Sequence, residues 1–520
     1  MIKEITNLGS QTPNSDLEGC DLPDNAITNA LNFVLRNNKV LSFNGSLLLT
    51  QQGTANGGYL DVTTSIAGTF FVVAARTGVF VYNGTTWFDI SNVAGYAGLA
   101  IDSELAWTGC KLGSIPIITN PGHFPEYWSP QSTGQKMQFL KFNTTQTWKD
   151  LNKTCKIIRS HNNFLFALYL IEGGVEQPLA YRWSHPADIN GLPFTWDPAD
   201  LSAIASLESL GGEGEYIVDG LSLRDDFFIY TNRTVSVLRY IGQDSPFVFE
   251  RRTFSKTLSL LSTNCVIEAA GAHYLLTSND LLINDGNSLT SLLNKKLRRL
   301  LQLTINPTYT DRCFAAANHR KNEIWFFIVS TRNVFPDTIY IVNYIDNTVS
   351  IRDTEGDKTS AYVGPRSILA DGWNVDALTW DFDDAPWALP SSTVFDDELI
   401  TLDRTQCVLS SLDTTDGARD LQTSIERTNL SFDGQENVTT ITEVYPDIVC
   451  AATVTIELGS HDYVNSPVRW KPGVVFDPSV QRKADIRTTG KLHAWRVRSN
   501  GSIDFVLSGM RFKYVHNGTR

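Results

Sequence analysis

The sequence contains residue types that often act in catalysis, such as His, Cys, Asp and Glu, but their spacing does not match a known active-site motif. The sequence lacks the phosphate-binding pattern G-x-x-x-x-G-K-[ST], the metalloprotease pattern H-E-x-x-H and the nucleophile pattern G-x-S-x-G. A cluster of carboxylates begins among the glycines of 211–214, and this composition favours a solvated loop over an acid–base pair. The clustered residues are Glu213, Glu215, Asp219, Asp225 and Asp226. The sequence therefore predicts no catalytic site and no enzyme activity.

The histidines and cysteines also lack the spacing of a metal site. The eight histidines show no ligand spacing, and none of the seven cysteines forms a C-x-x-C pair. The stretch Asp371–Pro390 is rich in Asp and Trp, but it lacks the D-x-D-x-D-G order of a calcium loop, so we prefer a role in capping a sheet. No metal and no cofactor are predicted. Four cysteines lie inside apolar runs, which predicts small, buried, reduced thiols: Cys155, Cys265, Cys313 and Cys407.

Two groups of basic residues are candidates for contacts with a partner or with DNA. The chain carries a net charge of −13, which argues against a surface that binds phosphates over a broad area. The stretch Ser288–Gln302 has the periodicity of an amphipathic helix, whose apolar side holds Leu289, Leu292, Leu293, Leu297, Leu300 and Leu301. Its basic face either is solvated or contacts DNA or an acidic neighbour. The candidate contact residues are Lys295, Lys296, Arg298 and Arg299 on this helix, and Arg496, Arg498 and Arg511 near the C-terminus.

Most of the chain is predicted to form short antiparallel strands. The stretch Arg312–Asp353 holds four runs rich in Ile, Val, Phe, Trp and Tyr, separated by turns that contain Asn, Asp and Pro. Within it, residues 325–328 are predicted to be a strand buried on both faces, because no polar residue interrupts them. Similar hairpins recur at 70–83, 164–183, 227–240, 273–284, 324–344 and 398–412, with a weaker unit at 105–128.

A hairpin that recurs at this interval favours an all-β fold with a β-propeller. The mean spacing of about 50 residues suits four-stranded blades, and the alternative is a pair of β-sandwiches. We predict an extended N-terminal arm over 1–39, a propeller of about six blades over 40–414, and a sandwich-like C-terminal β-domain over 415–520. The start of the sequence has no apolar core like a signal peptide, and no stretch of about 18 apolar residues occurs, so no membrane anchor is expected.

Five segments follow one another in an informative order. They are LPDNAITNALNFVLRNNKVLSFNG at 22–45, YRWSHPADINGLPFTWDPAD at 181–200, the stretch 219–286, the strand-rich stretch 322–353, and GKLHAWRVRSNGSIDFVLSGMRF at 490–512. In this order they resemble the tail nozzle proteins of short-tailed (podovirus-type) bacteriophages, also called tail tubular protein B. They are also similar to packaged-DNA stabilisation proteins. The resemblance spans most of the chain.

The resemblance implies a structural virion protein. In that family a propeller subunit forms a six-fold ring below the portal, and the ring lines the channel through which the genome leaves. The implied partners are further copies in a homo-hexamer, the tail adaptor protein and tail fibre or spike proteins, with genomic DNA passing without sequence-specific binding. The implied location is the virion tail, after synthesis in the host bacterial cytoplasm. The alternative is a propeller that binds or degrades glycans, in which Trp87, Trp196 and Trp387 could stack on sugars.

The implied channel leads to two expectations about charge. Its wall should be mainly acidic or neutral, with at most narrow basic rings from the predicted helix, because firm binding would hold the DNA in place. The arginines near the C-terminus should meet an acidic surface of a neighbouring subunit or of the adaptor, because opposite charges orient association. The equally open interpretation is that these arginines lie on a solvated strand face.

Overall fold

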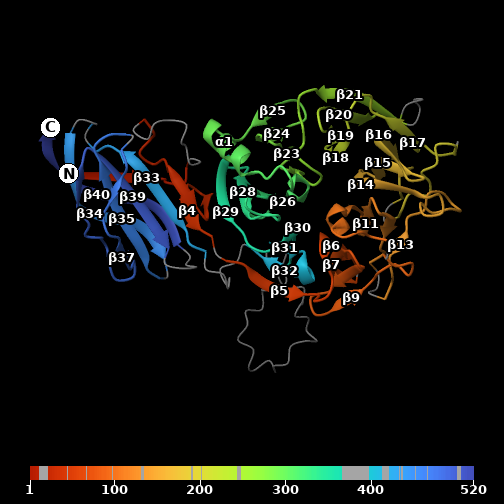
Figure 1. The fold of residues 1–520 in the computed structure, drawn as a ribbon, viewed down its shortest axis with the longest axis horizontal. Helices are drawn as coiled ribbons and strands as arrows, with labels where there is room; N and C mark the ends of the chain where they lie inside the picture. The colour runs from red at the N-terminus through yellow and green to blue at the C-terminus, as the bar shows by residue number, and fades with distance from the viewer. Residues whose placement is uncertain are drawn as a thin grey trace, which may run out of the picture.

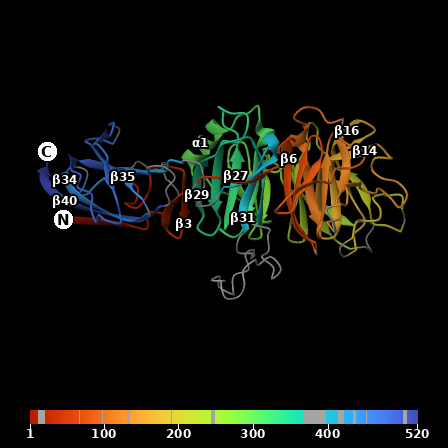
Figure 2. The same cartoon turned by 90° about the horizontal axis from the view of Figure 1, so that it is seen from below.

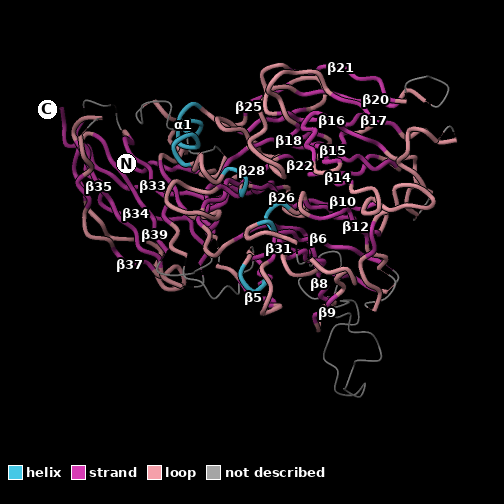
Figure 3. The backbone as a smooth tube through the Cα atoms, turned by 45° about the vertical axis from the view of Figure 1, so that its right-hand side comes forward, coloured by secondary structure: helices cyan, strands magenta, loops and turns pink. Residues whose placement is uncertain are grey.

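The computed structural model confirms an all-β chain. It describes residues 1–10, 21–43, 45–65, 67–96, 98–130, 134–188, 191–200, 202–242, 248–365, 397–412, 421–432, 434, 437–450, 452–464, 466–499 and 505–519. These residues form seven four-stranded sheets, two six-stranded sheets and one α-helix, α1 (Lys295–Thr304). The tube in Figure 3 shows strands throughout, with α1 in cyan. The stretch Asp371–Pro390, with its predicted capping role, lies outside the described residues.

The seven four-stranded sheets are the blades of a propeller and follow one another around its axis in chain order (Figure 1). All strands within a blade are antiparallel, and the first strand of each blade contacts the first strand of the next. Blade 1 contains β6 (Gly57–Ser65), β7 (Gly68–Ala75), β8 (Val79–Tyr82) and β9 (Trp87–Asp89). Blade 2 contains β10 (Thr108–Leu112), β11 (Ile115–Asn120), β12 (His123–Tyr127) and β13 (Gln138–Phe139). Blade 3 contains β14 (Lys153–His161), β15 (Phe164–Glu172), β16 (Val175–Trp183) and β17 (Ser206–Ser209).

The remaining blades complete the circle. Blade 4 contains β18 (Ile217–Leu223), β19 (Asp226–Thr231), β20 (Val235–Tyr240) and β21 (Phe249–Ser255). Blade 5 contains β22 (Val266–Ala269), β23 (Ala272–Leu276), β24 (Leu281–Asn284) and β25 (Leu289–Ser291). Blade 6 contains β26 (Phe314–Asn318), β27 (Glu323–Ile328), β28 (Thr338–Asn343) and β29 (Thr348–Asp353). Blade 7 contains β30 (Lys358–Pro365), β31 (Asp397–Asp403), β32 (Val408–Ser411) and β5 (Leu47–Gln51).

The blade count is therefore seven, where the sequence predicted about six. The six clear hairpins are the two middle strands of blades 1, 3, 4, 5, 6 and 7, and the weaker unit at 105–128 is blade 2. The strands of blade 2 are short and contain Pro116 and Pro125, which weakens their strand signal. Blade 7 closes the circle, because β5 from the start of the propeller pairs with β32 from its end.

The second domain is a β-sandwich made from both ends of the chain. One sheet contains β1 (Ile2–Thr6), β3 (Phe33–Arg36), β4 (Lys39–Ser42), β34 (Asn437–Cys450), β38 (Thr488–Gly490) and β40 (Phe505–Thr519). The other contains β2 (Asn29–Leu31), β33 (Ser424–Leu430), β35 (Val454–His461), β36 (Arg469–Trp470), β37 (Val474–Phe476) and β39 (Leu492–Ser499). The sandwich-like C-terminal domain is confirmed.

The prediction of an extended N-terminal arm over 1–39 is wrong for the described residues of that range, 1–10 and 21–39. β1 pairs with β40 from Ile2 opposite Lys513 to Thr6 opposite Gly509, and β2 pairs with β33. β3 and β4 form a hairpin whose second strand also pairs with β40, so Val40 belongs to the sandwich and not to the propeller. The propeller is thus inserted between the two parts of the sandwich. These strands are three to five residues long, and β1, β2 and β4 each pair with a strand about 400 residues or more away in sequence, so local patterns did not reveal them.

A buried junction holds the sandwich against blade 6 (Figure 2). Arg36 at the end of β3 donates from Nε to Glu323 Oε1 at 2.5 Å and from Nη2 to Glu323 Oε2 at 2.8 Å. Glu323 has a fully buried side chain and also accepts a hydrogen bond from the Trp325 indole N–H at 3.1 Å. The Arg352 guanidinium lies 4.9 Å from the centre of the Phe43 ring. These contacts fix the orientation of the two domains.

The predicted core strand is confirmed, and the predicted helix is partly wrong. Every residue of β27 is buried, including Trp325 at 0% exposure. Helix α1 begins at Lys295, since Asn294 caps it by accepting a hydrogen bond from the Leu297 N–H and the preceding residues form β25. Of the predicted apolar residues within the helix, Leu297 and Leu301 are buried while Leu300 is 43% exposed. The four cysteines predicted to be buried and reduced are buried and free.

We expect acid to destabilise the propeller through His273. This residue is fully buried, its Nδ1 lies 2.7 Å from the Tyr230 hydroxyl, and its Nε2 lies 2.8 Å from the Ser222 carbonyl oxygen. Burial lowers the pKa of His273 to about 4, below its ordinary value near 6.5. The folded state favours the neutral ring of His273. The stabilisation that follows from this is complete above pH 6.5 and is lost as the pH falls toward 4. Its expected size between pH 7 and pH 5 is about 2 kcal/mol.

Urea unfolding at pH 7, 6 and 5 measures this loss. His273→Gln should reduce the pH dependence of the free energy of unfolding by about 2 kcal/mol. An unaltered pH dependence in the His273 variant would contradict the assignment. Burial likewise lowers the pKa of His493 to about 4, so some acid sensitivity should remain after the substitution.

Candidate functional site

The centre of the propeller is filled by charged and polar side chains, which we call the axial network. Arg159 on β14 donates from Nε and Nη2 to the two carboxylate oxygens of Asp219 on β18, each at 3.0 Å. The same guanidinium donates to the Gly109 carbonyl on β10 at 2.9 Å and to Asn264 Oδ1 at 2.8 Å. One arginine therefore joins blades 2, 3, 4 and the start of blade 5.

A lysine continues the axial network on the other side. The Lys111 ammonium on β10 donates to the Val62 carbonyl on β6 and to the Tyr362 hydroxyl on β30, both at 2.7 Å. Its nitrogen lies 3.5 Å from Asp61 Oδ1. Burial raises the pKa of Asp61, and Lys111 opposes that rise. Blades 7, 1 and 2 are thus joined by one cation, as blades 2 to 5 are joined by Arg159.

One end of the axis is covered by the short helix η1 (Ser103–Ala106), which lies between blades 1 and 2. Glu104 has a fully buried side chain and accepts a hydrogen bond from Arg404 Nε at 2.7 Å. Asp102 also pairs with Arg404 and lies 3.5 Å from Arg312 Nη2. Arg312 precedes blade 6 and Arg404 follows β31 of blade 7, so η1 connects the first blades of the propeller to the last ones.

A cavity of about 280 Å³ remains beneath η1 at this end of the axis. Its lining combines two carboxylates, one ammonium, hydroxyls, an amide and the Tyr216 ring. The lining residues include Asp102, Thr108, Lys156, Tyr216, Thr263, Asn264 and Asp311. Such a set can hydrogen-bond water or a small polar molecule. In the described part of the chain, no group of three or more His, Cys, Asp or Glu side chains is placed to hold a metal ion.

The basic residues predicted as contacts lie in two separate places. On α1, Lys295, Lys296 and Arg299 are exposed, while Arg298 lies 2.9 Å from Asp280 Oδ2. On the sandwich, Arg496 is engaged within its own sheet, since it bonds to Glu426 at 2.6 Å and Glu457 at 3.0 Å and lies 4.0 Å from the centre of the Trp470 ring. Their role in binding a partner stays a prediction.

The other two arginines near the C-terminus are more open. Arg498 has a 43% exposed side chain and lies 3.4 Å from Glu457 Oε1. Arg511 is exposed on β40, where it stands opposite Glu4 of β1 and Tyr445 of β34. These positions leave Arg498 and Arg511 more accessible to a partner than Arg496.

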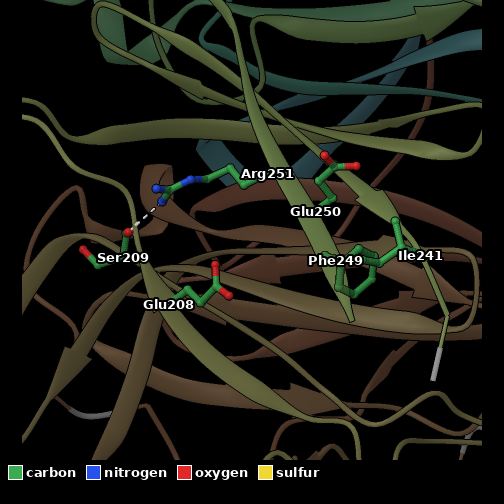
Figure 4. Close-up of a pocket in the computed structure, with 6 residues that line it drawn as sticks. All are labelled: Glu208, Ser209, Ile241, Phe249, Glu250 and Arg251. Carbon is green, nitrogen blue, oxygen red and sulfur yellow. Dashed lines mark hydrogen bonds between the residues drawn. The ribbon is translucent and has the colours of Figure 1, made fainter. Parts of the chain in front are cut away.

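Two shallow grooves flank β17 at the outer edge of blade 3. The larger has a volume of about 590 Å³ and lies between β17 and β21 of blade 4. Figure 4 shows its lining, with Arg251 donating to the Ser209 backbone carbonyl at 2.8 Å. The smaller groove, of about 410 Å³, lies on the side of β16 and includes Leu179 and Leu207. Glu208 lines both grooves.

Sequence patterns missed the axial network. Asp219 was assigned to a solvated loop with the other clustered carboxylates, but it is fully buried on β18 and pairs with Arg159. Its partner is 60 residues away in sequence, so no local spacing could reveal the pair. The position of Asp219 inside a strand, with Ile217 and Val218 before it, was the available signal. Of the tryptophans considered for sugar stacking, Trp196 is fully buried, Trp87 is partly buried and Trp387 lies outside the described residues.

This chain is similar to known proteins in fold alone. No protein-family model and no curated protein matches the sequence. Similar solved structures include a catalytically inactive virginiamycin B lyase from Staphylococcus aureus with quinupristin (TM-score 0.40, 9% identity, 71% of this chain and 98% of that one). Others are YCF48 (0.34, 11%, 72% and 96%) and the WD40 domain of Neurospora crassa Pan2 (0.35, 8%, 70% and 95%). We take no function from them. No helix among the described residues is long and apolar enough to cross a membrane.

Proposed function

We propose that this chain is a structural virion protein, one subunit of a ring-shaped tail nozzle that extends the portal and adaptor channel and conducts or retains the genome. The proposal starts from the order of segments that resembles the nozzle proteins of short-tailed bacteriophages. Its partners would be further copies in a hexamer, the adaptor and the tail fibres or spikes.

The observation that supports the proposal is that ion pairs and hydrogen bonds of buried or largely buried side chains connect the two domains and the blades. The Arg36–Glu323 pair fixes the sandwich to blade 6, and the axial network joins blades 7 and 1 to 5 around the axis. Paired, buried charges of this kind favour one arrangement of packed elements, and a wall that resists internal pressure needs such rigidity. In this proposal the propeller is a building block of the ring wall, and DNA passes through the central channel of the ring and not along the propeller axis.

The first test is the mass of the purified chain. Native mass spectrometry and negative-stain imaging at high protein concentration should show closed rings, since cyclic symmetry is the usual way to close a head-to-tail contact. A monomer at every concentration would contradict the nozzle proposal. A monomer that also binds or cleaves a glycan would favour the alternative, for which the polar lining of the axial cavity, with Tyr216, is the supporting observation.

A nozzle wall should also bind duplex DNA weakly. The net charge of −13 repels phosphates, and passage of the genome requires short-lived contacts. Fluorescence anisotropy at physiological salt should give a dissociation constant weaker than about 10⁻⁵ M. Tight binding with a steep dependence on salt would indicate a dedicated DNA-binding surface and would exclude a passive conduit.

A further inference from the structure

Helix α1 presents an exposed stripe that mixes cations with leucines. Its members, Lys296, Arg299, Leu300 and Leu303, are three or four residues apart and so share one helix face, which we call the α1 stripe. Leu300 is 43% exposed and Leu303 is 66% exposed. Surfaces that contact DNA are mostly polar and basic, so two open leucines beside the charges favour a protein partner. The buried face of the helix, with Leu297 and Leu301, already packs on the propeller.

The two grooves beside β17 are complementary to the α1 stripe, because they combine carboxylates with exposed apolar side chains. Together they contain two carboxylates, Glu208 and Glu250, and one guanidinium, Arg251. Their exposed apolar side chains are Ile241 at 45% and Leu207 at 38%. An amphipathic helix that lays leucines into such a groove and pairs cations with its carboxylates is a recurring mode of protein recognition. The groove region and the α1 stripe therefore match in both charge and polarity.

We propose that the α1 stripe of one copy binds the grooves beside β17 of a second copy, and that this contact builds the ring. The inference rests on the proposed nozzle function and names its subunit interface. The two surfaces are different, so the contact is head-to-tail and can propagate around a closed ring. Leu300 and Leu303 would pack on Leu207 and Ile241, while Lys296 and Arg299 would face Glu208 and Glu250.

The positions of the two surfaces suit a six-fold ring whose axis is parallel to the propeller axis. Helix α1 lies between blades 5 and 6, and the grooves lie on blade 3 and between blades 3 and 4. Adjacent blades of a seven-bladed propeller are about 51° apart, so the two surfaces are separated by about 100–130° around the axis. Figure 1 shows α1 and β17 on different sides of the propeller. In a ring of six, the two contact faces of a subunit are inclined by about 120°.

Cross-linking between single-cysteine variants tests the contact directly. Copies with Leu303→Cys are mixed with copies with Leu207→Cys and treated with a short thiol-specific cross-linker. We expect a cross-linked dimer, and we expect none when Leu303→Cys is mixed with Val475→Cys, which lies on β37 of the sandwich. Each variant alone measures the background from the native thiols, of which Cys110 and Cys450 are partly exposed.

Assembly of charge-reversed copies tests the same contact independently. Lys296→Glu with Arg299→Glu in one copy, and Glu208→Lys with Glu250→Lys in another, should each lower the fraction of chain in rings by about tenfold or more. Mixing the two should restore mixed contacts between unlike copies. A Leu300→Asp, Leu303→Asp variant should stay monomeric, whereas Val480→Asp, at a position of the sandwich that is 79% exposed, should still form rings.

The outcomes separate this interface from the nozzle proposal. Rings of the native chain together with the Leu303–Leu207 cross-link support both. Rings that persist in the Leu300→Asp, Leu303→Asp variant, or that give no such cross-link, overturn the interface and leave the nozzle proposal standing. The cross-link without closed rings supports the contact and contradicts the nozzle. Neither rings nor cross-link at high protein concentration overturns both.

Discussion

Trp325→Asp should abolish the soluble folded protein. Trp325 is completely buried in β27, and its ring centre lies 5.6 Å from that of Phe43 in an edge-to-face contact. Loss of such a tryptophan costs about 3–5 kcal/mol in packing. An unpaired buried carboxylate adds several kcal/mol more, and the nearby Glu323 would repel it. The sum approaches the whole stability of an ordinary domain, which is about 5–15 kcal/mol.

The amount of soluble protein after expression and its profile in size-exclusion chromatography measure this effect. Trp87→Asp is the matched control, because Trp87 is only partly buried on β9 at the outer edge of blade 1. We expect that variant to remain soluble with a modest loss of stability. Soluble, assembled Trp325→Asp protein would show that β27 is not a central core strand.

Glu323→Ala should lower the free energy of unfolding by about 3–5 kcal/mol, because it removes a fully buried carboxylate that pairs with the largely buried Arg36 guanidinium, whose side chain is 19% exposed. It also removes the acceptor of the Trp325 indole N–H. The pair is bidentate, and Arg36 comes from the sandwich while Glu323 comes from blade 6. The substitution should therefore weaken the junction as well as the fold, so that the sandwich and the propeller unfold in two separate transitions.

Urea unfolding would measure the loss of stability. Hydrogen exchange in β3 and β27, measured during the unfolding, would show whether the sandwich and the propeller unfold separately. Replacing both partners by apolar residues, with Arg36→Met and Glu323→Leu, should recover most of the lost stability, since no charge then remains buried. The control is Arg469→Ala. Arg469 pairs with Asp462 at 2.8 Å, but the two side chains are 66% and 47% exposed, so the loss should stay below about 1 kcal/mol. An equally small loss for Glu323→Ala would mean that the junction does not depend on this ion pair.

Local patterns in the sequence determined the blade units. Each of the six clear hairpins combines β-branched and aromatic runs with a polar turn, and both signals depend on residues close together in the chain. The strand 325–328 could be predicted to be buried for the same reason. An uninterrupted apolar run indicates burial on both faces without information about the strands that lie beside it in the fold. The all-β class, the propeller and the sandwich-like end of the chain could be predicted at this level.

Tertiary structure alone decided which distant segments meet. Strand β5 closes blade 7, and β1 pairs with β40 about 500 residues later. The residues of β5 and β1 do not indicate which distant strand will be the partner. The axial network is likewise built from residues such as Arg159 and Asp219, which are brought together because innermost strands of neighbouring blades converge on one axis. Which leucines of α1 are exposed also depended on the cap at Asn294 and on β25 taking the residues before it. Periodicity reports a helix face, but the rest of the fold decides which face is covered.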